Sequence, residues 1–138
     1  MRLEGDFAMC SASSDVWLPR SRRSPAIARQ RVLALLSSVP GGEGFLDAGL
    51  LAVSELVTNA VLHGTPAGYL IYLSLDVDST RLRIEVHDAR RDREPVVSAP
   101  GLGDEAGRGL HLVKSVAVRW GCCPRQPIGK IVWCEVVV

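Results

Sequence analysis

Two neighbouring stretches of the chain alternate between apolar and polar residues, and this pattern restricts the possible folds more than any other feature. Tyr69 to Val77 and Arg81 to Asp88 both alternate, and Asp78-Ser79 between them has the composition of a turn. A link this short joins antiparallel strands. The expected inward rows are Ile71, Leu73, Leu75 and Val77, then Leu82, Ile84, Val86 and Asp88, with Arg81, Arg83, Glu85 and His87 outward. The second inward row therefore ends in a carboxylate.

Two helices are predicted before this pair of strands. Ser24-Pro25 resembles an N-cap with proline at the first helical position, and the first helix is expected to run to about Ser38. Its apolar stripe consists of Ile27, Ala28, Val32, Leu35 and Leu36. The second helix is expected from residue 45 or 46 to Leu62, where His63-Gly64 and a following proline end it.

Further strands and a third helix are expected around these elements. Residues 15–18 fit a short edge strand before Pro19, 108–116 a helix, and 118–123 with 130–138 a second hairpin. Every link between strands that lacks a helix is short enough for an antiparallel hairpin. We therefore expect a two-layer α+β sandwich, with a mixed, mostly antiparallel sheet and helices on one face.

The length of the chain, 138 residues, suits one domain with a single core. Residues 1–14 are small and polar and are expected to form a disordered tail, which leaves 15–138 as the domain. Residues 89–107 contain a cluster of charges followed by prolines and glycines without periodicity. A loop this long inside a small domain is either functional or disordered.

The composition excludes several classes of function. Sixteen basic and fifteen acidic residues leave a formal charge of +1, and 47% of residues are hydrophobic, which argues against disorder, a nucleic-acid partner and a membrane-surface role. Residues 1–14 have no long apolar core, so we expect neither a signal peptide nor a membrane span there, and a cytoplasmic location. The four cysteines lack CxxC spacing, which favours reduced thiols over a metal site.

One stripe of the second predicted helix is a candidate site. Glu55, Asn59 and His63 recur every four residues and so share one side of an α-helix. The stripe is either the solvent-exposed face of an amphipathic helix or the wall of a pocket. The same side also holds apolar residues, which makes it a poor solvent face. In a pocket, Glu55 would act as an acceptor or base and Asn59 as an oxygen ligand for a hard cation such as Mg²⁺.

Two other features supply complementary chemistry. Asp88 is in phase with a buried row, where a carboxylate is costly unless it is paired or hydrogen-bonded. It is either a strand end that reaches water or an acceptor for the N–H donors of a ligand, such as an adenine amino group. Gly107 and Gly109 open a helix, and free backbone N–H groups at a helix N-terminus bind phosphate. Together the three features supply what a Mg-ATP site needs.

The combination resembles the Bergerat-fold (GHKL) ATPases, which include the ATP sites of gyrase, heat-shock chaperone, histidine-kinase and mismatch-repair proteins. Within this superfamily the chain is most similar, over residues 16–137, to the small stand-alone anti-sigma-factor serine/threonine kinases of actinobacterial type. The asparagine box of that family, E-x-x-x-N-A-x-x-H-G, is matched in full from Glu55 to Gly64. The second glycine box, G-x-G-L-x-L-V, is matched from Gly107 to Val113.

The resemblance implies that Asn59 coordinates Mg²⁺, that Glu55 is the general base and that Asp88 binds adenine. It assigns ATP contacts to Asn59, His63, Asp88, Gly107, Arg108, Gly109 and Leu110, and an ATP lid to residues 89–107. The first glycine box expects glycine or serine two residues after the aspartate, and here Arg90 stands in that place. Arginine adds bulk and charge where glycine lets the backbone approach the nucleotide, although it has the length to reach a phosphate.

In function, the resemblance implies transfer of the γ-phosphoryl group of ATP to a serine or threonine of a STAS-type anti-anti-sigma partner. It also implies sequestration of a sigma factor, without direct contact with nucleic acid or membrane, and leaves homodimer formation open. The alternative is a nucleotide-gated binding module without kinase activity, which Arg90 favours. A detached catalytic domain of a sensor histidine kinase is expected less, because the sequence shows no phosphoacceptor helix or transmembrane segment.

Overall fold

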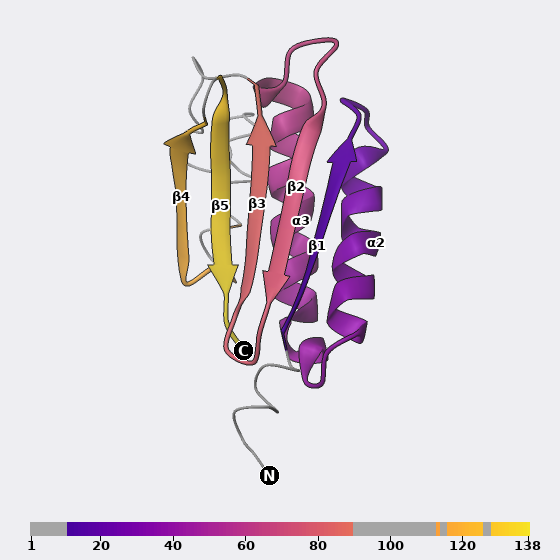
Figure 1. The fold of residues 1–138 in the computed structure, drawn as a ribbon, viewed down its shortest axis with the longest axis vertical. Helices are drawn as coiled ribbons and strands as arrows, with labels where there is room; N and C mark the ends of the chain where they lie inside the picture. Colours follow the sequence, from indigo (N-terminus) through magenta and orange to yellow (C-terminus); the bar gives the residue numbers. More distant parts are fainter. Residues whose placement is uncertain (1–10, 90–112, 114–115, 126–127) are drawn as a thin grey trace, which may run out of the picture.

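The computed structural model describes residues 11–89, 113, 116–125 and 128–138. Its five strands form one sheet in the order β1-β2-β3-β5-β4, and helices α2 and α3 lie together on one face of it (Figure 1). The elements are β1 (Ala12–Leu18), α2 (Ser24–Ser37), η1 (Gly42–Phe45), α3 (Leu46–Asn59), η2 (Ala60–Gly64), β2 (Ile71–Val77), β3 (Leu82–Asp88), β4 (Arg119–Pro124) and β5 (Lys130–Val136). The expected two-layer α+β sandwich is confirmed, and the four strand pairs of the described sheet are all antiparallel.

The inward rows of the central hairpin are those that the alternation predicts. Every second residue of β2 and β3 is buried, from Ile71 to Val77 and from Leu82 to Asp88. The helices cover these rows with the buried residues Ala28, Val32, Leu35 and Leu36 of α2 and Gly49, Ala52, Val53, Leu56 and Val57 of α3. One apolar core results between the two layers.

Helix α2 differs from the prediction at its start. Ser24 lies inside the helix, not at its cap, and its buried hydroxyl donates to the Pro19 carbonyl oxygen at 2.5 Å. The Ser21 hydroxyl oxygen accepts from the backbone N–H of Arg23, the residue before the helix, at 3.1 Å. Ile27 is exposed although the stripe was expected to include it. It lies about 100° from Ala28 around the helix, which turns its side chain away from the core.

Helix α3 ends at Asn59, so the predicted α-helix up to Leu62 is wrong. Residues Ala60–Gly64 form a π-helical turn, after which Thr65 is extended, with φ −120° and ψ 120°. A π turn contains more residues than an α turn, so it changes the side of the helix on which later residues lie. The stop at His63-Gly64 is confirmed, but the last turn is π.

Strand β1 begins at Ala12, earlier than the predicted Asp15. It pairs with β2 along its whole length, from Ala12 opposite Val77 to Leu18 opposite Ile71, and this pairing fixes where it starts. The strand is at the edge of the sheet, as expected, and Pro19 follows it. Residues 1–10 of the expected tail lie outside the described residues.

Gly42–His63 is the one stretch of the described chain that is long and apolar enough to cross a membrane, with 22 residues and a mean hydropathy of 1.5. In this fold the stretch contains α3, which packs against β3 and β5 with its apolar side in the core. Its hydrophobicity is therefore explained by its place in the domain core.

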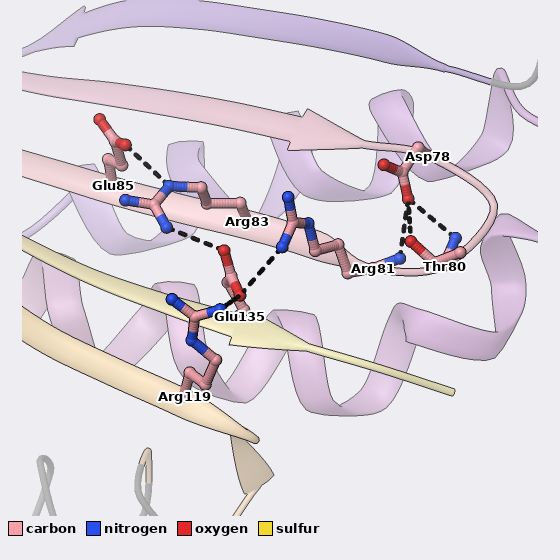
Figure 2. A network of polar contacts seen from close by, with 7 residues as sticks. All are labelled: Asp78, Thr80, Arg81, Arg83, Glu85, Arg119 and Glu135. Atoms are coloured by element: carbon pink, nitrogen blue, oxygen red, sulfur yellow. Dashed lines mark hydrogen bonds and ion pairs between the residues drawn. The ribbon is translucent and has the colours of Figure 1, made fainter. Parts of the chain in front are cut away.

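The other face of the sheet, which α2 and α3 leave uncovered, carries a network of charged side chains (Figure 2). Glu135 of β5 is only 3% exposed on this face. Its Oε2 accepts a hydrogen bond from Arg83 at 2.9 Å, and Arg81 and Arg119 approach Oε1 at 3.4 and 3.6 Å. Arg83 also donates to Glu85 at 2.9 Å. On this face, guanidinium groups and not a helix cover the Glu135 carboxylate.

Candidate functional site

The C-terminal end of α3 carries the first part of the candidate site. Glu55 and Asn59 lie one helical turn apart, and both side chains are half-buried. The Nδ2 atom of Asn59 is buried and has no hydrogen-bond partner within the described part of the chain. A buried N–H group without an acceptor costs about 1–3 kcal/mol. A ligand that supplies an acceptor at this point would remove that cost.

His63 lies in the π turn that follows this pair. The predicted stripe of Glu55, Asn59 and His63 assumed α-helical geometry throughout. The backbone from Ala60 onward is π-helical, and His63 is exposed whereas Asn59 is half-buried. The common side of Glu55 and Asn59 follows from α-helical geometry, and a site role for His63 stays a prediction. A π turn within a helix is often found at functional sites.

Asp88, at the end of β3, supplies the second part. Its side chain is buried on the inward row, as its phase predicts. Lys130, the first residue of β5, lies directly opposite it in the sheet. The Lys130 Nζ atom is 3.2 Å from Oδ1 and 3.1 Å from Oδ2 of Asp88, and the two side chains are 7% and 2% exposed. The charge of Lys130 thus offsets the free-energy cost that is expected for burial of the Asp88 carboxylate.

Gly129 explains how Lys130 reaches this position. Its φ of +104° lies in the left-handed region, and a Cβ atom at this residue would collide with the backbone carbonyl oxygen of Asp88. The carbonyl of Gly129 also accepts from the Arg125 N–H at 3.0 Å, which closes the turn between β4 and β5. The turn therefore brings the start of β5 against the end of β3.

Both parts lie at the same end of the molecule. In Figure 1 the C-terminal end of α3 and the end of β3 are both at the top of the sheet. The π turn that follows Asn59 packs against β3. The fold therefore gathers a half-buried acid and amide from the helix layer and a buried acid from the sheet layer at one end of the domain.

The remaining predicted residues lie outside the described residues. These are Gly107, Arg108, Gly109 and Leu110, together with Arg90 and the rest of the expected lid after Ala89. From the predicted third helix the structure describes Val113 and Val116, both helical, and Val113 is fully buried in the core.

A scan against protein families identifies the domain. The family model of the histidine kinase-like ATPase domain matches residues 19–133, which is most of the chain. This chain belongs to the histidine kinase-like ATPase domain family. Comparison with curated proteins gave no match. Membership in this GHKL-type family supports ATP binding, and Mg²⁺ usually accompanies ATP in it.

The residues of this histidine kinase-like ATPase domain fit such a ligand. The buried Nδ2 of Asn59 has no partner among the described residues and requires an acceptor, and the side-chain oxygen of the same amide is a suitable ligand for Mg²⁺. Within the described residues no three His, Cys, Asp or Glu side chains gather as a metal cluster. This suits Mg²⁺, which in nucleotide sites takes one or two protein oxygens together with phosphates and water. Asn59 would hold the ion, which would neutralise phosphate charge.

Sequence reasoning missed Lys130 and Gly129, although a signal for the first was present. Lys130 is one of only two lysines in the sequence and is in phase with Val132 and Cys134 of the same strand. A basic residue on a buried row indicates a paired charge or a hydrogen bond, just as an acidic residue does. Two such charges, one on each of two strands, predict a buried ion pair once the strands are known to be neighbours.

Proposed function

We propose that this domain is an ATP-dependent serine/threonine protein kinase that acts as an anti-sigma factor. The observation that supports the proposal best is the full asparagine box on a helix of a histidine kinase-like ATPase domain, with Glu55 one turn before Asn59. In the proposed reaction the Glu55 carboxylate accepts the proton of a serine or threonine hydroxyl. The hydroxyl oxygen bonds to the γ-phosphorus, the bond from that phosphorus to the bridging oxygen breaks, and ADP leaves.

The partners of the proposed kinase are a STAS-type anti-anti-sigma protein, which is phosphorylated, and a sigma factor, which is sequestered. We place this exchange in the cytoplasm, and homodimer formation is compatible with it. Binding of one partner would exclude the other, which is a coupling between sites.

The test is phosphate transfer from γ-labelled Mg-ATP to candidate anti-anti-sigma proteins. Glu55→Gln is expected to lower the transfer rate at least about 100-fold, the usual contribution of a general base, while ATP affinity stays close to that of the wild type. The matched control is Glu43→Gln, which removes an exposed carboxylate just before the other end of α3 and is expected to leave transfer unchanged. Equal transfer by the wild type and Glu55→Gln would reject the base role.

Asn59→Ala separates binding from transfer. It is expected to abolish Mg-ATP binding, measured by calorimetry, because it removes the proposed metal ligand. Retention of wild-type affinity by this variant would reject that role.

A second candidate is a nucleotide-gated binding module of the same fold that transfers no phosphate. Arg90, in place of glycine or serine in the first glycine box, favours it. The discriminating experiment is a pull-down with and without ATP, followed by identification of the bound proteins and labelling with γ-labelled ATP. ATP-dependent capture of a partner without any labelling of that partner supports the module and rejects the kinase.

A further inference from the structure

Strand β1 forms one edge of the sheet (Figure 1). It pairs with β2 along its whole length, from Ala12 to Leu18, and β2 is its only neighbour among the described strands. Within the described chain, no backbone hydrogen bond outside the helices and strands involves residues 12–18. An edge strand presents a row of backbone N–H and C=O groups away from the sheet, and a further strand can pair with them.

The two edge strands of this sheet differ in how they are protected. Proteins guard an edge with a short strand, a proline, a bulge or charged side chains, lysine above all. Strand β4 has six residues, begins at Arg119 and ends at Pro124. Strand β1 has seven residues, pairs without a bulge and contains neither proline nor a basic residue. Its one charged residue, Asp15, opposes the approach of an acidic strand but not of a basic one.

The inward row of β1 is incompletely covered. On β2 and β3 every inward residue is buried, whereas on β1 the residues Ala12, Ser14 and Val16 are only half-buried. Ala12 and Val16 pack against the core from this position. The apolar core therefore extends to the edge of the sheet without full cover. A sixth strand beside β1 would remove more of this apolar surface from water.

The outward row of β1 indicates the chemistry of a strand that pairs there. It includes Asp15 and Trp17, and Trp17 is 55% exposed, with its ring centroid 4.8 Å from that of Tyr72. Strands β1 and β2 together contain two carboxylates, Asp15 and Asp76, and no basic residue. Three arginines of this face surround Glu135 of β5 instead (Figure 2). A cation beside β1 would therefore gain both a counter-charge and an aromatic ring.

We infer that the free edge of β1 is a docking site for an extended, basic segment of a protein partner, which pairs with β1 as a sixth strand. Backbone hydrogen bonds would supply affinity, and side chains next to Asp15 and Trp17 would supply selectivity. A second copy of this chain fits less well. Antiparallel pairing of two β1 strands in full overlap places Asp15 opposite Asp15, and like charges directly opposite are destabilising. The inference is independent of nucleotide binding and of the proposed kinase activity.

The test uses three seven-residue peptides and the full chain without nucleotide. The first peptide alternates valine with arginine, and the second has glutamate in place of arginine. The third is the arginine peptide with every backbone amide methylated, which removes the donors that pairing needs. Calorimetry is expected to show binding of the arginine peptide with a Kd of up to about 1 mM, because a short peptide loses conformational freedom on binding.

The two control peptides separate charge from backbone pairing. The glutamate peptide is expected to bind about 10-fold more weakly, since it converts attractive cross-strand pairs into repulsive ones. The methylated peptide is expected not to bind. Amide hydrogen exchange then locates the arginine peptide, with protection expected in residues 12–18 and not in β4.

Three variants test the side chains of the site. Asp15→Asn is expected to reduce the preference for arginine over glutamate to about threefold or less. Trp17→Ala is expected to weaken binding of the arginine peptide about two- to fivefold, the value of an exposed cation–π contact. Asp47→Asn is the matched control, because it removes one exposed carboxylate from the helix layer, and it is expected to change neither value.

Several outcomes would overturn the inference. Absence of binding by the arginine peptide, or equal binding by its methylated form, would reject strand addition. Equal affinity for the arginine and glutamate peptides, or an unchanged preference in Asp15→Asn, would reject the basic partner. Protection in β4 alone would move the docking site to the other edge. Protection of residues 12–18 that rises with protein concentration in the absence of peptide, together with a dimer in sedimentation, would show that a second copy occupies the edge.

Discussion

Among the glycines that the structure describes, Gly129 is the one at which an added Cβ atom would approach another atom most closely. Its φ of +104° strains any L-residue, and a Cβ there would meet the carbonyl oxygen of Asp88, which is rigid backbone. We expect Gly129→Ala to lower the free energy of unfolding by roughly 2–4 kcal/mol, measured by urea denaturation. Gly68→Ala is the matched control, because Gly68 has a φ of +88° with no atom within 4 Å of the added Cβ. It is expected to cost only about 1 kcal/mol. Equal costs would show that steric contact with Asp88 contributes nothing.

Glu135 is a buried carboxylate whose partners are partly exposed. Its side chain is 4% exposed, whereas those of Arg83, Arg81 and Arg119 are 30%, 49% and 63% exposed. Glu135→Gln leaves these guanidinium groups without their shared counter-charge (Figure 2). We expect the free energy of unfolding to fall by about 1–3 kcal/mol, less than for a fully buried pair because water screens the arginines. Arg119→Ala, which removes the most exposed partner, is expected to cost under about 1 kcal/mol. A larger loss from Arg119→Ala than from Glu135→Gln would contradict this view.

At the scale of elements, the sequence predicts which side of a strand is buried better than where an element begins or ends, for a physical reason. Alternation in β2 and β3 reflects burial of one face, and the covering helices make that pattern strict. The start of β1 depends on pairing with β2, which its own residues do not encode. The π turn after Asn59 leaves the apolar pattern of the helix intact, so periodicity does not separate it from an α turn. The ion pair of Asp88 with Lys130 joins residues 42 positions apart, and only the sheet order reveals it.

The β2–β3 turn contributes to stability in a pH-dependent way. Asp78 Oδ1 accepts from the Thr80 hydroxyl at 2.7 Å and from the N–H groups of Thr80 and Arg81 at 2.8 and 2.9 Å. These bonds, the Thr80 hydroxyl first, lower the pKa of Asp78 below its ordinary value of 3.8. The resulting stability is present above pH 3.8 and is lost as pH falls through the lower pKa of the folded state. The free energy of unfolding, measured by urea titration at pH 6, is thus expected to be higher for the wild type than for Asp78→Asn. This difference is expected to disappear in acid.

Asp76, on the adjacent strand, provides a control of opposite sign. Burial first, and then the charges of Asp15 and Glu85, raise the pKa of Asp76. Its ionised form therefore disfavours the folded state above the raised pKa, and this penalty is relieved as pH falls. Asp76→Asn is expected to be more stable than wild type at pH 6 and to lose that advantage in acid. A common pH dependence for both variants would show that overall charge, not these local contacts, sets the profile.

At the scale of the whole molecule, the three thiols within the described residues divide into two classes, exposed and buried, that report different events. Cys122 and Cys123 are exposed on the edge strand β4, whereas Cys134 is buried in the core, where burial raises the pKa of its thiol to about 12. Thiolate is the reactive form, so Cys134 is protected both by packing and by protonation. With site-resolved mass spectrometry at pH 8, we expect iodoacetamide to label Cys122 and Cys123 in the folded protein. Cys134 is expected to react only through global unfolding.

Labelling of Cys134 therefore connects nucleotide binding to the stability of the entire domain. A ligand that binds only the folded state reduces the unfolded population by the factor 1 + [L]/Kd. Mg-ATP at about 100 times its Kd is thus expected to slow labelling of Cys134 roughly 100-fold, provided that refolding is faster than alkylation. The edge thiols of Cys122 and Cys123 serve as internal controls, since their reaction requires no unfolding. In Asn59→Ala the protection should disappear with ATP affinity. Rapid labelling of Cys134 without ATP would show instead that strand β5 opens locally. The part of the core near Glu135 would then not belong to the part of the domain that nucleotide binding stabilises.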